Sequence, residues 1–88
     1  MGENMSGEKR RFTLEIMGEI YVVKGDIDAE RAQRLAASLD ARMRKIAQAN
    51  PRLSLSKIAV LAALNIMDEY LKLEEDYQQL IKMVQEQK

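Results

Sequence analysis

The sequence predicts an α+β fold that is mostly α-helical. The expected ββαα protomer has a small head, made of a β-hairpin and a helix, and a long C-terminal helix that forms a coiled-coil oligomer. Three observations support this fold class. Two short runs with strand character precede residue 25, an amphipathic pattern covers residues 29–49, and an uninterrupted helical pattern extends from about residue 54 to the C-terminus.

The hairpin is predicted from alternation and from turn residues. Every second position is apolar at Phe12, Leu14 and Ile16, which is the period of a half-buried strand. Gly18-Glu19 then offers a tight turn, because glycine adopts a positive φ at little cost. The β-branched and aromatic run at residues 20–23 predicts the second strand, which ends at Gly25-Asp26.

The first helix is expected from about Ala29 to Ala49. Asp28 is the expected N-cap, since its carboxylate can accept hydrogen bonds from the backbone amides two and three residues on. Asn50-Pro51 ends the helix, because the residue before a proline is disfavoured in the helical conformation. The apolar stripe of this helix consists of Ala32, Leu35, Ala36, Leu39, Met43, Ile46 and Ala47.

The second helix has two differently patterned halves, and either Ser54 or Ser56 caps it. All seven residues from Ile58 to Leu64 are apolar. From Ile66 onward the apolar positions thin to one row with spacings of 4, 3, 4, 3 and 4, the heptad pattern of a coiled coil. The residues expected at the contact between subunits are Ile58, Leu61, Ala62, Asn65, Ile66, Tyr70, Leu73, Tyr77, Leu80 and Val84.

Self-association is expected from the length of this helix. About 33 residues would span about 50 Å, which is more than a small head can cover. The sequence therefore predicts an obligate oligomer, and it leaves dimer against tetramer and the helix orientation open. Asn65 interrupts the apolar zone, so it either fixes the register between subunits or bonds to nearby backbone.

Three segments follow from these patterns. Residues 1–10 are polar and lack an apolar core, which is typical of a disordered tail and not of a signal peptide. Residues 11–57 are expected to form the head, and residues 54–88 the oligomerisation helix, with the coiled coil from about residue 66. Because the longest apolar run is too short to span a bilayer, we expect a soluble, cytoplasmic protein without a membrane partner.

The composition argues against an enzyme. The 88 residues include no Cys and no His, which removes thiolate ligands, imidazole ligands and the usual near-neutral base. Residues 25–28 (GDID) superficially resemble a calcium loop, but Glu30 and Arg31 stand where the third ligand and the glycine are needed. The carboxylates at residues 68–69 and 74–76 are expected to be solvated flanks of the helix. We therefore expect no catalytic residues, no cofactor and no metal site.

Charge is unevenly distributed on a chain with no net charge. Residues 31–57 hold seven basic side chains against Asp40 alone, a net charge of +6, whereas residues 58–88 carry a net charge of −3. The basic segment indicates either an acidic partner surface or a solvated helix face. A nucleic-acid interface is the alternative, using a strip made of Arg31, Arg34, Arg42, Lys45 and Arg52. The pI of about 6.3 and the lack of a recognition motif argue against it.

One extended motif resembles a known family. It consists of Asn50-Pro51-Arg52-Leu53-Ser54, then Lys57-Ile58-Ala59-Val60-Leu61-Ala62-Ala63-Leu64-Asn65-Ile66, and then Asp68-Glu69. The hairpin from Ile16-Met17-Gly18 to Tyr21-Val22-Val23-Lys24-Gly25-Asp26 fits the same pattern. Together they resemble the ZapA family of small bacterial proteins associated with the cell-division ring. The resemblance covers Arg11 to Lys88 and is closest to the short form of that family.

The resemblance implies a non-enzymatic activator of ring assembly at midcell. Proteins of this family bind FtsZ, the tubulin-like division GTPase, and cross-link its protofilaments into bundles as dimers or tetramers. In the family the filament contacts lie on the head. Carried onto this sequence, they point to Arg52, Ser54, Ser56, Lys57 and Glu19, with Arg42 and Lys45 in addition. Besides nucleic-acid binding, a generic coiled-coil adaptor for another partner is the remaining alternative.

Overall fold

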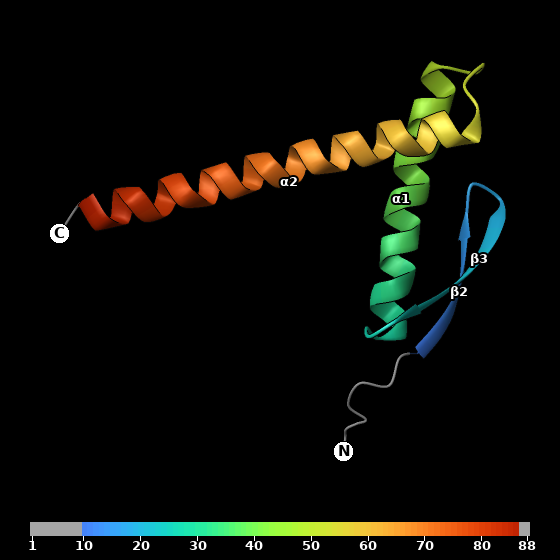
Figure 1. Ribbon diagram of the computed structural model, residues 1–88, viewed down its shortest axis with the longest axis horizontal. Helices are drawn as coiled ribbons and strands as arrows, with labels where there is room; N and C mark the ends of the chain where they lie inside the picture. The colour runs from blue at the N-terminus through green and yellow to red at the C-terminus, as the bar shows by residue number, and fades with distance from the viewer. Residues whose placement is uncertain (1–9, 87–88) are drawn as a thin grey trace. The chain divides into compact units, whose positions relative to one another are not determined.

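The computed structural model describes residues 10–86 and contains four elements (Figure 1). They are β2 (Arg10–Ile16), β3 (Glu19–Gly25), α1 (Ala29–Ala49) and α2 (Leu55–Glu86). The predicted fold class is confirmed: a two-stranded antiparallel hairpin precedes two helices, and the chain is mostly helical. Of the tail expected at residues 1–10, only Arg10 is described, as the first residue of β2.

The chain divides into two compact units, with the boundary between Arg52 and Leu53. The hairpin and α1 belong to the first unit, and α2 belongs to the second. In the described part of the chain, neither helix is long and apolar enough to cross a membrane.

The hairpin turn lies one residue earlier than the sequence predicts. Ile16 pairs with Glu19, so the two turn residues are Met17 and Gly18, not Gly18 and Glu19. Both have positive φ, 56° at Met17 and 78° at Gly18. Positive φ at both central positions is the type I′ turn, whose twist matches that of the two strands. The prediction was wrong because it gave the first turn position to glycine, whereas Met17 adopts the left-handed conformation here.

Two side chains of α1 hold the hairpin, one at β2 and one at the turn. Asp40 Oδ1 accepts a hydrogen bond from the Met17 N–H at 2.6 Å, and Gln33 Nε2 donates to the Thr13 carbonyl at 3.3 Å. The bond from Asp40 thus fixes the amide of Met17, whose left-handed backbone conformation is unfavourable for a residue other than glycine. In the first unit, β2 is the strand that contacts α1, and Figure 1 shows the hairpin beside this helix.

The core of the first unit lies between β2 and α1. Phe12 from the strand and Ala32, Ala36 and Met43 from the helix are buried. The two alanines leave little side chain between helix and strand, so the backbones can approach closely. Leu35, also predicted for the apolar stripe, is 54% exposed. Successive residues of a helix are about 100° apart around its axis, so Leu35 lies to one side of the row formed by Ala32, Ala36 and Met43.

The helix ends confirm the predicted signals and answer one open question. Asp28 Oδ1 accepts from the Arg31 N–H at 2.7 Å, which caps α1. At the other end, the Asn50 N–H donates to the Ile46 carbonyl at 2.9 Å. Ser54 Oγ accepts from the Lys57 N–H at 3.3 Å, so Ser54, not Ser56, caps α2.

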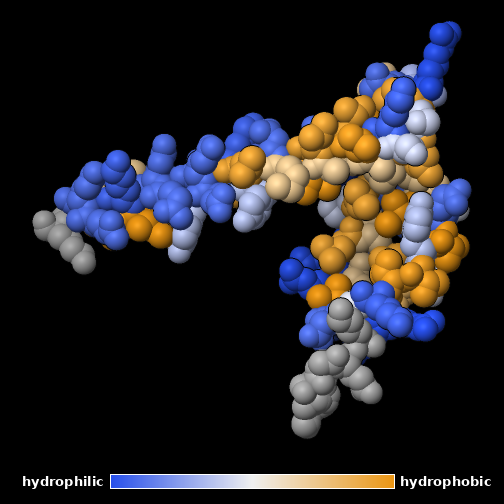
Figure 2. All heavy atoms as spheres, in the orientation of Figure 1, coloured by the Kyte–Doolittle hydropathy of each residue, from blue (hydrophilic) through white to orange (hydrophobic). Residues whose placement is uncertain are grey.

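The second unit is dominated by α2, whose 32 residues give a length of about 48 Å. Ile58 and Ala62 are buried, and nearly all other residues of the helix are exposed. In Figure 2 apolar atoms gather over the first half of α2, and polar atoms predominate over its second half. This distribution matches the two patterns seen in the sequence.

Asp40 also carries an ion pair. Its Oδ2 accepts from Arg44 Nε at 2.8 Å, one helical turn further along α1. The hydrogen bond from Arg44, together with the one from the Met17 N–H, lowers the pKa of Asp40 below its ordinary value. A lowered pKa means that the folded chain binds this proton more weakly than the unfolded chain does. The ionised carboxylate therefore stabilises the fold above the ordinary pKa, and this contribution is lost as pH falls through the folded-state pKa.

We expect Asp40→Asn to lower the thermal unfolding midpoint at neutral pH, because the amide keeps an acceptor for the Met17 N–H but loses the charge paired with Arg44. The difference from the unsubstituted protein should shrink as the solution is acidified, since the native carboxyl is then also neutral. Circular dichroism melts from neutral to strongly acidic pH measure this. Asp68→Asn, which removes an exposed pair with Lys72 on α2, is the control with little expected effect. A difference that persists unchanged in acid would contradict the assignment.

We expect Ser54→Ala to reduce the free energy of unfolding by about 1 kcal/mol, because it removes the N-cap acceptor of α2. Ser56→Ala removes the same hydroxyl two residues on, where no helix amide depends on it, and should change the value by less than about 0.5 kcal/mol. Urea titrations of both variants make the comparison. Equal losses in the two variants would show that Ser54 is not the cap.

Candidate partner-binding surfaces

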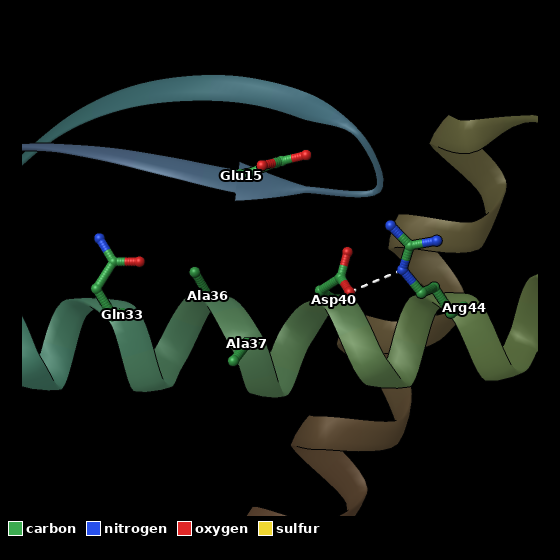
Figure 3. A pocket seen from close by; sticks show the side chains of 6 residues that line it. All are labelled: Glu15, Gln33, Ala36, Ala37, Asp40 and Arg44. Atoms are coloured by element: carbon green, nitrogen blue, oxygen red, sulfur yellow. Dashed lines mark hydrogen bonds and ion pairs between the residues drawn. The ribbon is translucent and has the colours of Figure 1, made fainter.

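A groove of about 340 Å³ lies between β2 and α1, and Figure 3 shows its lining. Its residues are Glu15, Gln33, Ala36, Ala37, Asp40 and Arg44. Glu15 extends from the strand above one face of the helix, which carries the others. Arg44 has a raised pKa because of its hydrogen bond to Asp40, so it stays charged. Since the Asp40 carboxylate bonds to both Arg44 and Met17, this groove lies where the helix holds the hairpin.

Sequence reasoning missed the role of Asp40. It treated this residue only as the single acid in a strongly basic segment. A signal was nevertheless present, because Asp40 lies four residues after Ala36 and continues the row that the buried alanines occupy. A lone carboxylate beside the buried face of a basic helix indicates a specific partner, and here that partner is the hairpin turn.

The predicted filament contacts in the first unit lie in three places. Glu19 is exposed and begins β3 directly after the turn that Asp40 holds. Arg42 is half-buried and Lys45 is exposed, and their spacing of three residues places them on one side of α1. Arg52 is exposed in the turn that follows α1.

The remaining predicted contacts fall at the start of α2. Ser54 is exposed, but its hydroxyl caps the helix. Ser56 and Lys57 are exposed in the first turn. These residues lie together because they are consecutive, and Ser56 and Lys57 are the two whose side chains make no cap.

A further basic surface lies on the first half of α1. A second groove of about 330 Å³ is lined by Arg31, Arg34, Leu35 and Ser38. These residues recur at helical spacing and lead along the helix toward Lys45. Four residues of the basic strip predicted from the sequence therefore lie along one side of α1, with the exposed Leu35 beside them, whereas Arg52 lies in the turn beyond the helix.

The predicted subunit contact on α2 is an exposed apolar row. Its members from Ile66 to Val84 are between 37% and 69% exposed. They are Ile66, Tyr70, Leu73, Tyr77, Leu80 and Val84. Ile58 and Ala62, which were predicted for the same contact, are already buried within the chain, so the accessible part of the row begins at Leu61. Asn65 is exposed.

Comparison with known proteins bears on this combination of hairpin, basic helix and apolar row. The family described as "Cell division protein ZapA" matches residues 12–88. A protein named Cell division protein ZapA from Geobacillus sp. strain WCH70 is 37% identical over 81 residues, which covers 92% of this chain and 93% of that protein. The protein of the same name from Bacillus licheniformis is 35% identical over 80 residues, covering 91% of this chain and 94% of that one.

A solved structure shares the fold as well as the sequence. The structure described as a ZapA mutant dimer from Geobacillus stearothermophilus superimposes with a TM-score of 0.73 at 34% identity. The match covers 97% of this chain and 95% of that chain. Both strands and both helices thus fall within the matched region. Sequence and structure agree over nearly the full length, and the chain belongs to the ZapA family.

Proposed function

We propose that this chain is a non-enzymatic cell-division protein that binds FtsZ polymers and cross-links them at the midcell ring in the cytoplasm. The observation that carries the proposal is membership of the ZapA family, whose relatives are named cell division proteins. The geometry supports it, since exposed basic side chains on the head can meet an acidic filament surface, and the apolar row on α2 can join two heads.

Self-association through α2 is the first part of the proposal. Six large apolar side chains at heptad spacing are exposed along about five turns of the helix. Full burial of an apolar side chain of this size contributes about 1.5–3 kcal/mol of free energy. Burial of this row against a second α2 would therefore favour association. The related solved structure is described as a dimer, which supports the same arrangement here.

Bridging follows from having two heads on one rod. A single head that binds a filament weakly becomes part of an avid complex when a second head is tethered to it, because the second binding event occurs at a high effective concentration. A monomer binds one filament and cannot bridge two. Oligomerisation and filament contact are thus separable requirements, and each can be removed alone.

We expect Leu73→Glu to break the oligomer, because it places a charge at the centre of the apolar row. Light scattering should show the monomer mass, and FtsZ filaments pelleted with GTP should no longer bundle. Gln79→Glu adds the same charge outside the row and should preserve both mass and bundling. An unchanged mass for Leu73→Glu would rule out this row as the contact.

We expect Arg52→Glu to weaken co-pelleting with FtsZ polymers by about tenfold, which corresponds to about 1.4 kcal/mol. Reversing a loop charge at a contact with carboxylates replaces attraction by repulsion. Oligomer mass and helix content should stay unchanged, since Arg52 is exposed outside both helices. Arg31→Glu makes the same charge change on α1 and should affect pelleting less. If both variants pellet like the unsubstituted protein, the turn is not the contact.

A further inference from the structure

The two strands of the hairpin differ in how their outer edges are satisfied. On β2, the outward carbonyl of Thr13 accepts a hydrogen bond from Gln33 of α1, and at the turn beyond β2 the Met17 N–H donates to Asp40. Within the described residues β3 makes no comparable contact with α1. Every residue of β3 is exposed except the half-buried Gly25. In the first unit α1 therefore lies against β2, whereas the edge of β3 is open.

The register shows which groups face the open edge. Ile16 and Glu19 flank a two-residue turn and so form a hydrogen-bonded pair, and such pairs alternate along an antiparallel hairpin. The amide and carbonyl groups of Ile20, Val22 and Lys24 therefore point away from β2. In residues 10–86 no hydrogen bond reaches these groups.

The open edge also lacks the features that normally prevent strand pairing. Ile20 and Val22 are each 62% exposed, and their neighbours Tyr21 and Val23 are 42% and 41% exposed. Proline, a bulge or a charge in the middle of an edge strand blocks the approach of another strand. Residues 20–23 contain none of these and pair with β2 without interruption. An edge of this kind is a template for another strand.

We propose that β3 pairs antiparallel with β3 of a second copy of this chain, around a two-fold axis at Val22, so that two hairpins form one four-stranded sheet. In this register Val22 faces the second copy's Val22, and Ile20 faces the second copy's Lys24. All outward amides and carbonyls of these residues then find partners. On the face that packs toward α1, Tyr21 lies opposite the second copy's Val23, and the apolar surface continues across the junction.

Charge favours a second copy as the occupant of this edge. In the hairpin Arg11 lies opposite Lys24, and Glu15 lies opposite Ile20. These positions alternate with the buried Phe12 along β2, and Glu15 also borders the groove beside α1. The proposed register places Lys24 beside the second copy's Ile20, with the second copy's Glu15 next in the row. The basic end of each hairpin thus meets the acidic end of the other. This contact uses only the first unit and is independent of the apolar row on α2.

The absence of cysteine makes a direct test possible. In the proposed register the two Val22 residues form a hydrogen-bonded pair with their Cα atoms about 5.5 Å apart, within the range that a disulfide spans. Under mild oxidation the full-length Val22→Cys protein should therefore form a disulfide-linked dimer at least about tenfold faster than the controls below. Circular dichroism of the reduced protein checks that the variant folds.

Two controls make the result specific. Thr13→Cys lies opposite Val22 on the same face, but the two copies are separated there by three strand spacings, about 14 Å. Ile20→Cys lies on the same edge but faces Lys24. Neither should link efficiently.

Equal linking of Val22→Cys and either control would overturn the proposal, as would faster linking of Ile20→Cys. The linking of Val22→Cys should persist when combined with Leu73→Glu, which separates this contact from association through α2, and its loss there would also overturn the proposal.

Discussion

The hydrogen bond from the Met17 N–H to Asp40 is the interaction on which the arrangement of the first unit depends. A two-stranded hairpin is marginal in water and must lie on an apolar surface. Here one strand packs on α1, and the carboxylate fixes the turn at the end of that strand. Because the register of a hairpin follows from its turn, this one bond also determines which groups of β3 face outward. Asp40 thereby influences a surface that it does not touch.

The second constraint is a shortage of buried surface. In the described chain the buried apolar side chains are few, and two of those on α1 are alanines. Meanwhile the larger apolar residues of β3 and of the second half of α2 are exposed. A small chain buries a modest fraction of its surface, so the remaining apolar rows are available for contacts with other molecules. The two exposed regions differ in kind: α2 offers side chains at heptad spacing, and β3 offers backbone groups.

Much of this fold follows from local signals in the sequence. The bounds of α1 were predictable because Asp28 and Asn50-Pro51 are strong end signals and the stripe between them has a clear period. The turn was misplaced because Met17 adopts a conformation that its side chain does not favour, and the reason lies on α1, far along the chain. The choice between Ser54 and Ser56 was likewise decided by three-dimensional geometry.

The candidate site was less predictable than the fold. Sequence reasoning and the family resemblance point to Arg52 and its neighbours, but the roles of exposed residues depend on a partner whose shape the chain does not encode. Ile58 and Ala62 illustrate a related difficulty. Their apolar character fits a contact between subunits and a contact within the chain equally well, and the structure shows them already buried.

The heptad spacing of α2 has a consequence for how this helix can vary in length. An insertion of seven residues adds two turns, lengthens the rod by about 10 Å and keeps the apolar row on the same side. An insertion of one or two residues rotates everything beyond it by about 100° or 200° and takes the distal part of the row out of line. Steps of about 10 Å therefore change the length while keeping the row in line. If heads at the ends of such rods bridge filaments, the spacing between filaments would be a property that evolution adjusts in discrete increments.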